Sequence, residues 1–372
     1  MSLATAELRR AKLRFGLLAS AVGLLVFLIL FQQALLGRLV TAFIGAIRSQ
    51  SAQVLVMGAE ARGNLEASRV GLDTAGRVGD VEGVDVAVPI AEATFTVRIN
   101  REQVEATLWG YPLDGPGGPT EVSDGRMAQG PGEAVVSDGD EAKGFKLGAT
   151  VMVEPGDQAI KIVGVADDSS FSGNPVLYVS DATFENARTA VNPDATQVIP
   201  SAVAVRTADG ADPERVAAAI TKAVDGAEGF TRAQAEAANP GVSSVRTSFF
   251  VILALFYVVV PLVSGLFFLI LTLQKANSLT LLRALGAPPG LLIRNLMVQV
   301  VGVVVVGVGL ATLLLWGASQ GANELGIGVE PGPVLITGGV ILALALLASL
   351  AAIRRVLAID PIKATTGSDV LA

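Results

Sequence analysis

The residues best suited to chemistry lie in a short basic stretch, Leu271–Leu296, between two long apolar runs. Asn277 or Ser278 is placed to cap a short helix in this stretch, and Gly286 fits the position just after its last turn. The basic residues of the stretch are Lys275, Arg283 and Arg294. A short capped helix that carries cationic and apolar side chains is suited to binding a cytosolic protein partner. The competing interpretation is a tight turn that only joins two helices.

Features of catalytic and metal sites are scarce in the sequence. The chain has no His and no Cys, which removes the usual general base near neutral pH and the commonest metal ligands. It has no G-x-x-x-x-G-K-[ST] phosphate loop, so it is not an ATPase by that route. The acidic residues around Asp138–Glu141 and Asp167-Asp168 lack EF-hand spacing and are interpreted as solvated turns. We therefore expect no catalytic residue, no metal site and no cofactor in this chain.

Composition points to a membrane protein with two unlike sides. Of the 372 residues, 51% are hydrophobic, and the mean hydropathy is +0.58. Residues 50–240 hold 29 acidic and 14 basic residues, whereas the rest of the chain holds 5 acidic and 13 basic residues. An acidic block between basic-flanked apolar runs indicates opposite sides of a membrane. It argues against binding to nucleic acid, which requires a basic face.

The first apolar run predicts a membrane anchor. Residues 1–14 are basic, and Phe15–Gly37 then gives 23 uncharged residues, enough to cross a bilayer. A signal peptide is the alternative, but this run exceeds the usual length of its apolar region. We assign residues 15–50 to a first transmembrane helix plus a stalk. The positive-inside rule places the N-terminus in the cytoplasm.

Three further apolar runs complete a four-span topology. We expect a stalk plus the second span at 241–274, the third span at 296–316 and the fourth at 334–353. Pro261 interrupts the second run and predicts a kink or hinge there. The loop at 317–333 is acidic, whereas the loop at 275–295 and the tail at 354–372 are basic. Both termini and the 275–295 loop are therefore expected in the cytoplasm.

The block at 51–240 alternates short strands with turn signals and predicts a folded extracytoplasmic domain. We expect a late strand at Ser201–Val205, followed by a helix with Asp212 as its N-cap and Pro213 at its first position. A subdomain boundary is expected near 190–200. The predicted strands are Gln53–Met57, Val86–Pro89, Ala93–Ile99, Ala134–Ser137, Ala149–Val153 and Ala159–Val165. The predicted fold class is an integral membrane α-helical protein with four transmembrane helices and a large α+β domain between helices 1 and 2.

Within the spans, small and uncharged residues set the expectations. No Asp, Glu, Lys or Arg lies in any of the four apolar runs, which argues against a proton relay or an ion pathway. Small residues recur at intervals that permit close helix packing. These pairs are Ala19 and Gly23, Gly339 and Ala343, Ala345 and Ser349, and Ala348 and Ala352.

With this topology, the basic stretch resembles the cytoplasmic coupling helix of MacB/FtsX-like ABC transporter permeases, also called type VII or mechanotransmission systems. The match is Arg283-Ala284-Leu285-Gly286-Ala287, and the preceding Leu271–Lys275 looks most like the branch containing the HrtB and DevC permeases. Ile359–Ala364 is similar to the C-terminal ending of the class. Short motifs follow the order of the MacB-type ectodomain at Gly125-Arg126, Glu133–Ser137, Lys146–Gly148 and Ile162–Val165. The chain departs from many MacB proteins in lacking an acidic residue just before Arg283.

This resemblance implies a homodimer in the plasma membrane that sits on two copies of a separate ABC ATPase. ATP and Mg would then be bound by the ATPase, and this subunit would be non-catalytic. The implied function is efflux or extraction of an amphipathic or lipophilic substrate: haem-like, lipid or peptide. The residues implied in ATPase coupling are Leu282, Arg283, Ala284, Leu285, Gly286 and Ala287.

Three other functions of the class stay open at this point. One is an FtsX-like regulator that activates an extracellular cell-wall hydrolase, although such permeases are usually shorter. The second is a lipoprotein-releasing permease, and the third is a sensor partner for antimicrobial peptides. An adjacent hydrolase or sensor-kinase gene would favour the first or third of these.

Aromatic and amide side chains near the outer ends of the first two spans are the candidate substrate contacts. Flat rings with a few amides at that depth suit a flat or acylated molecule in membrane lipid. The alternative is an ordinary lipid-facing or packing surface with glutamines at the interface. The candidates are Phe27, Phe31, Gln32, Phe249, Phe250 and Tyr257.

Overall fold

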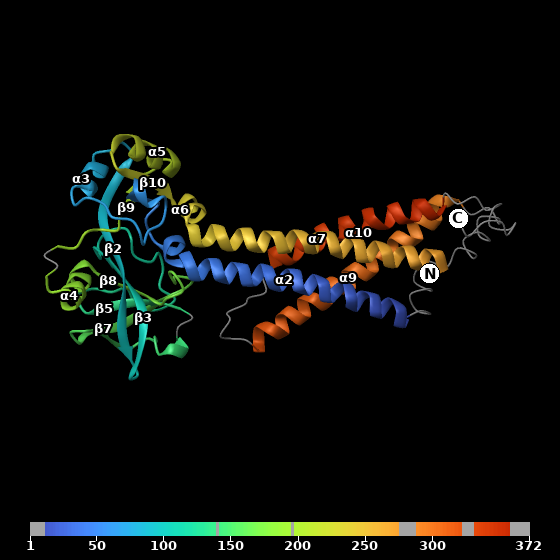
Figure 1. The fold of residues 1–372 in the computed structure, drawn as a ribbon, viewed down its shortest axis with the longest axis horizontal. Coiled ribbons are helices and arrows are strands. Elements are labelled where there is room, and N and C mark those ends of the chain that lie inside the picture. Colours follow the sequence, from blue (N-terminus) through green and yellow to red (C-terminus); the bar gives the residue numbers. More distant parts are fainter. Residues whose placement is uncertain (1–11, 139–140, 195–196, 275–287, 322–330, 358–372) are drawn as a thin grey trace. The chain divides into compact units, whose positions relative to one another are not determined.

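The computed structural model describes residues 12–138, 141–194, 197–274, 288–321 and 331–357. Contacts divide the chain into two compact units (Figure 1). We call Met1–Leu36 with Ser248–Ala372 the membrane unit, and Gly37–Thr247 the α+β domain. Each unit is described by itself.

Four long helices dominate the chain: α2 (Lys12–Ser49), α7 (Pro240–Gln274), α9 (Pro289–Gly321) and α10 (Pro331–Leu357). All four are long and apolar enough to cross a membrane, with a mean hydropathy of 2.4 to 2.6 in their most apolar windows. Together with the domain between α2 and α7, they confirm the predicted fold class.

Each of the last three helices begins ahead of its apolar run, at Pro240, Pro289 and Pro331. Proline suits a helix start because its fixed φ is already helical and its missing N–H would have no partner there. An apolar run therefore marks the part of a helix that fits in lipid, and not the helix itself.

The membrane unit is held partly by close approach between small residues. A Cβ added to Gly23 of α2 would lie 3.0 Å from the carbonyl oxygen of Gly307 in α9. Ala19, one turn earlier on α2, is buried and lines the same contact. In α7, a Cβ on Gly265 would lie 3.1 Å from the Cβ of Ala348 in α10. The small-residue spacing at Ala19 and Gly23 therefore does allow two helix backbones to meet.

The α+β domain is built on ten strands among its described residues, arranged in the order β10-β1-β9-β2-β3-β8-β5-β7-β4, while β6 pairs with β2 and β7. The pairs β3–β8 and β5–β7 are parallel, and the other pairs are antiparallel. The strands are β1 (Val54–Gly58), β2 (Val84–Ile99), β3 (Glu102–Tyr111), β4 (Asp124–Gly125), β5 (Glu133–Ser137), β6 (Thr150–Glu154), β7 (Gln158–Ala166), β8 (Val176–Ser180), β9 (Ala202–Thr207) and β10 (Ala227–Thr231). The helices are α3 (Thr74–Gly79), α4 (Asp181–Val191), α5 (Pro213–Ala223) and α6 (Arg232–Ala238), with short 3₁₀ turns at Ala59–Ala61 and Glu141–Lys143.

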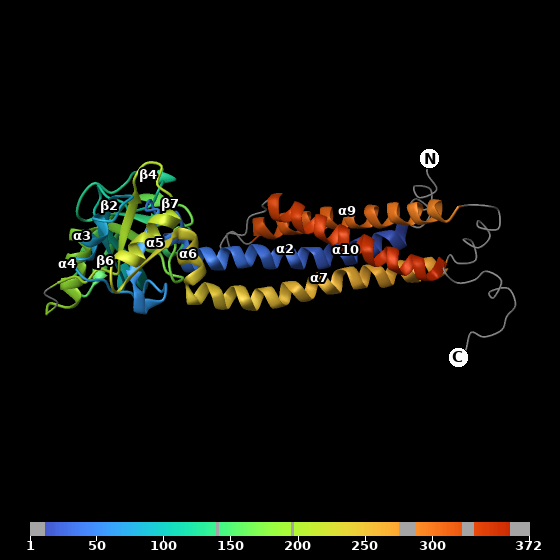
Figure 2. The same ribbon diagram turned by 90° about the horizontal axis from the view of Figure 1, so that it is seen from above.

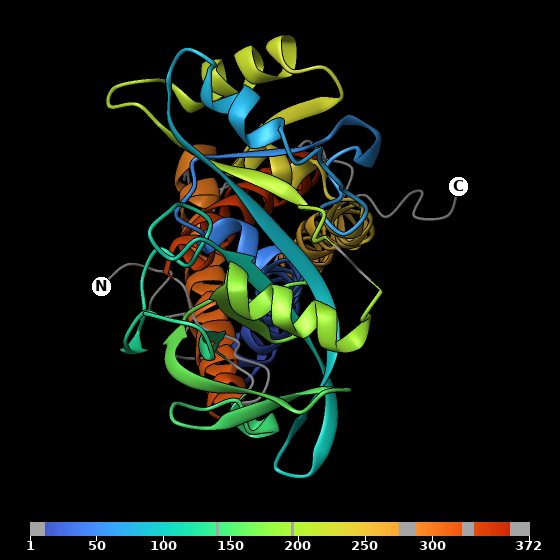
Figure 3. The same cartoon turned by 90° about the vertical axis from the view of Figure 1, so that its left-hand side faces the viewer.

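The 16-residue strand β2 ties the domain together, and Figure 3 shows it running across the domain as the long blue-green strand. Its first half pairs with β9 and its second half with β3 and β6. Two strands were expected here, Val86–Pro89 and Ala93–Ile99. The first was expected to end at Pro89, but Pro89 is paired with Val203 within the ladder, and the strand continues through it.

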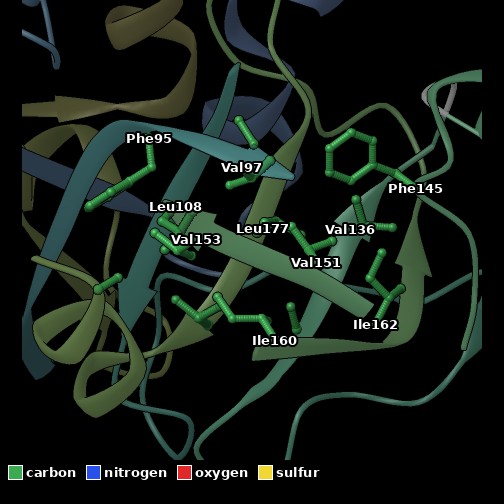
Figure 4. Packing of buried hydrophobic residues seen from close by; sticks show 14 of the residues in the cluster. Phe95, Val97, Leu108, Val136, Phe145, Val151, Val153, Ile160, Ile162 and Leu177 are labelled. Carbon is green, nitrogen blue, oxygen red and sulfur yellow. The ribbon is translucent and has the colours of Figure 1, made fainter. Parts of the chain in front are cut away.

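Two hydrophobic cores lie beside β2, one along each half of the strand. The larger includes Phe95, Val97, Leu108 and Phe145 and is packed among β2, β3 and β5–β8 (Figure 4). The smaller core contains residues from the early and the late part of the domain's sequence, such as Val54 of β1 and Val203 of β9. The boundary predicted near 190–200 lies between α4 and β9 and stays a prediction. Sequence order had not indicated that β1 and α3 pack with the residues that follow this boundary.

Helix α5 forms as its sequence predicts. The Asp212 side chain caps it by accepting a hydrogen bond from the Glu214 N–H at 3.1 Å, and Pro213 occupies the first turn. Val216 and Ile220 are buried in the smaller core. The capping residue and the apolar stripe are both local signals, so they could be recognised from the sequence.

Glu92 on β2 is a buried carboxyl group with 6% of its surface exposed. Burial and, to a lesser extent, the nearby Glu66 raise the pKa of Glu92 to about 7 from its ordinary 4.5, while Arg69 opposes the shift. The folded state therefore holds this proton more tightly than the unfolded state, so stability from this group is greatest below pH 4.5 and is lost as pH rises through 7.

We expect Glu92→Gln to stabilise the protein at pH 8 and to do so much less at pH 5. The neutral amide avoids the cost of ionising a buried group, a gain of about 2–3 kcal/mol at the higher pH. Thermal unfolding of the purified chain at the two pH values measures the difference. An equal effect of the substitution at both pH values would contradict this assignment.

The α2–α9 crossing gives a second prediction. We expect Gly23→Val to destabilise the membrane unit by about 1–3 kcal/mol, because its side chain must push α9 away at Gly307. Gly16→Val is the matched control on the same helix, since a Cβ at Gly16 would meet no atom within 4 Å. Thermal unfolding in detergent compares the two variants. Equal midpoints would show that the helices are not held together at this contact.

Candidate functional site

The residues assigned to ATPase coupling lie outside the described part of the chain. They are Leu282, Arg283, Ala284, Leu285, Gly286 and Ala287. The structure describes the flanking helices, of which α7 ends at Gln274 and α9 begins at Pro289. Arg294, in the early part of α9, is exposed.

The structure brings most of the predicted substrate residues together in the membrane unit. Phe27 and Phe31 lie one turn apart on α2 with ring centroids separated by 5.7 Å. Both pack against the buried core of the membrane unit, and so does Tyr257 of α7. Phe250 is separate from this group, because 69% of its surface is exposed.

Gln32 binds the helix backbone of α7. Its Nε2 donates a hydrogen bond to the carbonyl oxygen of Phe249 at 3.2 Å, and only 9% of Gln32 is exposed. Phe249 therefore contacts the other predicted substrate residues through its carbonyl oxygen. In the membrane unit, α2 and α7 lie side by side in both views (Figures 1 and 2), which this bond requires.

A closed ring of hydrogen bonds joins three helices next to these aromatic residues. The Gln33 Nε2 of α2 donates to the Tyr257 hydroxyl of α7 at 3.2 Å. The hydroxyls of Tyr257 and Thr337 of α10 lie 3.3 Å apart. The Thr337 hydroxyl donates to Gln33 Oε1 at 3.1 Å, which leaves the Tyr257 hydroxyl as donor to Thr337.

Sequence reasoning missed this ring. The sequence indicates amides near the aromatic residues of the first span, but it gives neither Gln33 nor Thr337 a partner. Thr337 is 1% exposed, and a polar side chain inside an apolar run was the available signal. That signal does not identify the hydrogen-bond partners of Thr337, because the three ring residues come from helices far apart in sequence. The ring consists of one amide and two hydroxyl groups, so its chemistry is hydrogen bonding.

One pattern at the end of α9 resembles a hydrolase motif. Residues Gly317–Gly321 read G-A-S-Q-G, which matches the G-x-S-x-G of serine hydrolases. That motif requires a strand–turn–helix, whereas these residues form the last turns of a helix. The Ser319 hydroxyl donates to the carbonyl oxygen of Trp316 at 2.7 Å, and the chain has no His to act as its base. The pattern is therefore a coincidence of small residues.

In the α+β domain, the last turns of α2 are fixed by main-chain hydrogen bonds to the loop after β7. The N–H of Ala46 donates to Ser170 at 3.0 Å, and the N–H of Gly173 donates to Ala42 at 2.9 Å. A Cβ on Gly45 would lie 2.4 Å from the carbonyl oxygen of Asp168, so the loop lies directly on the helix backbone.

Charged groups surround this joint. Arg38 of α2 pairs with Asp168 at 3.3 Å, and the N–H of Asp168 donates to the Asp138 carboxylate at 2.8 Å. Burial raises the pKa of Asp138, while its hydrogen bond from Asp168 lowers it. The predicted solvated acidic turn is thus partly a structural one. Among described residues, no group of three or more acidic side chains is arranged to hold a metal ion.

A second joint connects α2, α6 and α7. Glu236 of α6 pairs with Arg48 of α2 at 3.3 Å and also with Arg246 near the start of α7. Its side chain is 14% exposed, whereas the two arginines are about half exposed. Arg232 adds a hydrogen bond to the carbonyl oxygen of Gln50 at 3.1 Å. We call Arg48, Glu236 and Arg246 the stalk clamp.

Known proteins share this organisation. Residues 17–223 match the family model described as the MacB-like periplasmic core domain. An uncharacterised ABC transporter permease of Mycobacterium tuberculosis is 26% identical over 296 residues, which cover 78% of this chain and 77% of that protein. A protein of the same description from Mycobacterium bovis gives the same values.

Solved domains are also similar. The periplasmic region of MacB from Actinobacillus actinomycetemcomitans has 13% identity and a TM-score of 0.37, covering 50% of this chain and 92% of that domain. The extracellular domain of YknZ from Gram-positive bacteria has 17% identity and a TM-score of 0.33, covering 48% and 99%. Because the family model spans more than half of the residues, the chain belongs to the family of ABC-type permeases that carry a MacB-like periplasmic core domain.

Proposed function

We propose that this chain is the permease subunit of an ABC-type mechanotransmission complex in the plasma membrane. A homodimer of the chain binds two copies of a separate ABC ATPase, which holds ATP and Mg. Both termini and the 275–295 loop lie in the cytoplasm, and the α+β domain lies outside. ATP hydrolysis by the partner moves an amphipathic or lipophilic substrate out of the membrane or its outer leaflet.

One observation carries this proposal: α2 and α7 continue without a break from their apolar runs into the α+β domain. At 1.5 Å per residue, the 38 residues of α2 and the 35 of α7 are each about 50–57 Å long. Helix α2 has no internal proline, so it is suited to transmit a push along its axis from one end to the other. Helix α7 is continuous but contains Pro261, where it is easier to bend. Both joints described above fasten these helices to the domain.

The substrate class follows from the side chains of the membrane unit. Its apolar runs hold no Asp, Glu, Lys or Arg, which does not favour a hydrated channel for ions. Phe27 and Phe31 offer flat apolar surface, and Gln32 offers one amide beside them. This combination suits a molecule that is itself partly in lipid, such as a lipid, an acylated peptide or a haem-like ring.

The coupling role rests on the segment 282–287. Its arginine is proposed to pair with acidic groups of the ATPase while Leu282 and Leu285 pack into a groove beside them. The direction of the charges agrees with this role, because the loop at 275–295 contains three basic residues and no acidic one.

The coupling proposal predicts that the chain alone hydrolyses no ATP and that Arg283→Glu uncouples the complex. When it is co-expressed with its ABC ATPase, the variant should co-purify less and lose most substrate-stimulated hydrolysis. Arg294→Glu is the matched charge reversal and should retain both properties. Normal assembly and turnover of the Arg283 variant would return the segment to a plain connecting turn. A normal coupled complex that moves no lipid, porphyrin or peptide would favour the FtsX-like regulator.

The stalk clamp gives a separate prediction. We expect Glu236→Gln to increase hydrogen exchange in residues 240–247 about three- to tenfold, because both arginines lose their charged partner. Asp85→Asn is the control, since it removes one exposed carboxylate from a single pair with Arg206. In the full complex, the Glu236 variant should hydrolyse ATP but move less substrate. Unchanged exchange in the 240–247 segment would show that the clamp does not hold α7.

A further inference from the structure

We propose that the ring of Gln33, Tyr257 and Thr337 is a latch that holds the first part of α7 against α2 and α10, across a hinge at Pro261. Release of the latch loosens this arm of α7, which we define as Ser248–Val259 and which Gln32 also contacts through the Phe249 carbonyl oxygen. That the transport cycle opens the latch rests on the proposed function. The latch itself rests on contacts within the membrane unit.

Pro261 weakens α7 at the residue that the ring holds. Proline has no N–H, so the carbonyl oxygen four residues earlier, that of Tyr257, loses its helical hydrogen bond. The carbonyl oxygen of Tyr257 therefore has no helical hydrogen bond, while its hydroxyl group forms hydrogen bonds with α2 and α10. A helix bends most easily where its hydrogen-bond ladder is interrupted.

Packing differs on the two sides of this proline. From Ser248 to Val259, no residue of α7 is fully buried in the chain. From Val260 onward, α7 buries one face that includes Ser264, Gly265 and Phe268. The later part is thus fastened by close packing, and the arm is fastened by fewer contacts.

The ring and the close-packed contact fix α7 to the same neighbour. Tyr257 meets Thr337 of α10, and eight residues later Gly265 packs against Ala348 of α10. The hinge lies between these two contacts. If the Tyr257–Thr337 contact opens while Gly265 stays packed on Ala348, the part of α7 before Pro261 can rotate relative to the part after it.

Hydrogen bonds make the ring a two-state contact. Each hydroxyl both donates and accepts, so the three bonds form one cycle in which each polarises the next. Thr337 is almost fully buried, and inside an apolar unit its hydroxyl has few other partners. Loss of Tyr257 should remove both bonds to α7, and loss of Thr337 should open the cycle and leave only the Gln33–Tyr257 bond.

The tyrosine content allows a direct test on the full chain in lipid nanodiscs. The chain has three tyrosines, and two of them, Tyr111 and Tyr178, are in the α+β domain. Fluorine NMR of fluorotyrosine-labelled protein therefore gives one signal from the membrane unit, which Tyr257→Phe identifies by its loss. We expect Thr337→Val to shift the Tyr257 signal and leave the other two in place.

Hydrogen exchange then measures the arm. We expect Thr337→Val and Tyr257→Phe each to raise exchange in the arm about three- to tenfold, with little change in residues 262–274. The double variant should show no more than Tyr257→Phe alone, because that change already removes both bonds to α7. Thr312→Val is the matched control, since that hydroxyl donates within its own helix to Val308 at 2.9 Å. Exchange equal to that control, or raised evenly along α7, would overturn the latch.

The last step adds the ATPase and a non-hydrolysable ATP analogue. If the cycle opens the latch, the wild-type Tyr257 signal should move toward its position in Thr337→Val. A wild-type signal that stays in place while nucleotide-dependent changes occur elsewhere would overturn this role. If no ATPase binds the chain, the proposed function fails, and the measurements on the chain alone still decide the latch.

Discussion

Main-chain polar groups cannot be left unpaired in lipid, and the architecture of this permease follows from that constraint. A helix satisfies its own N–H and C=O groups, so each apolar run must be helical across its length. Helices α2 and α7 extend beyond their apolar runs, and each is one continuous helix, of 38 and 35 residues respectively.

The need to pair polar groups in lipid also explains the few polar features inside the apolar runs. Pro261 leaves one carbonyl oxygen without its helical donor, and the polar side chains of Gln33, Tyr257 and Thr337 must find partners among apolar neighbours. They find one another. The interrupted helix and the ring of hydrogen bonds therefore meet at one residue, Tyr257.

Two kinds of contact hold the long helices, and they differ in what they permit. Gly23 with Gly307, and Gly265 with Ala348, bring backbones together through many small contacts that do not switch. The ring and the stalk clamp depend on a few directional or charged bonds that are either made or broken. Motion is therefore expected at the second kind of contact, with the first kind serving as pivots.

The sequence alone determined the four spans, the inserted α+β domain, the cap of α5 and the membership of a permease class, because each of these depends on local signals. Apolar runs, charge asymmetry, Asp212 and Pro213 act within a few residues of where they stand. Tertiary structure alone decided that Thr337 meets Gln33 across 304 positions, that Glu236 holds both α2 and α7, and that β1 packs with β9. A polar residue in an apolar run shows that a partner is needed, but the identity of that partner depends on how the helices pack, and packing joins residues that no spacing rule connects.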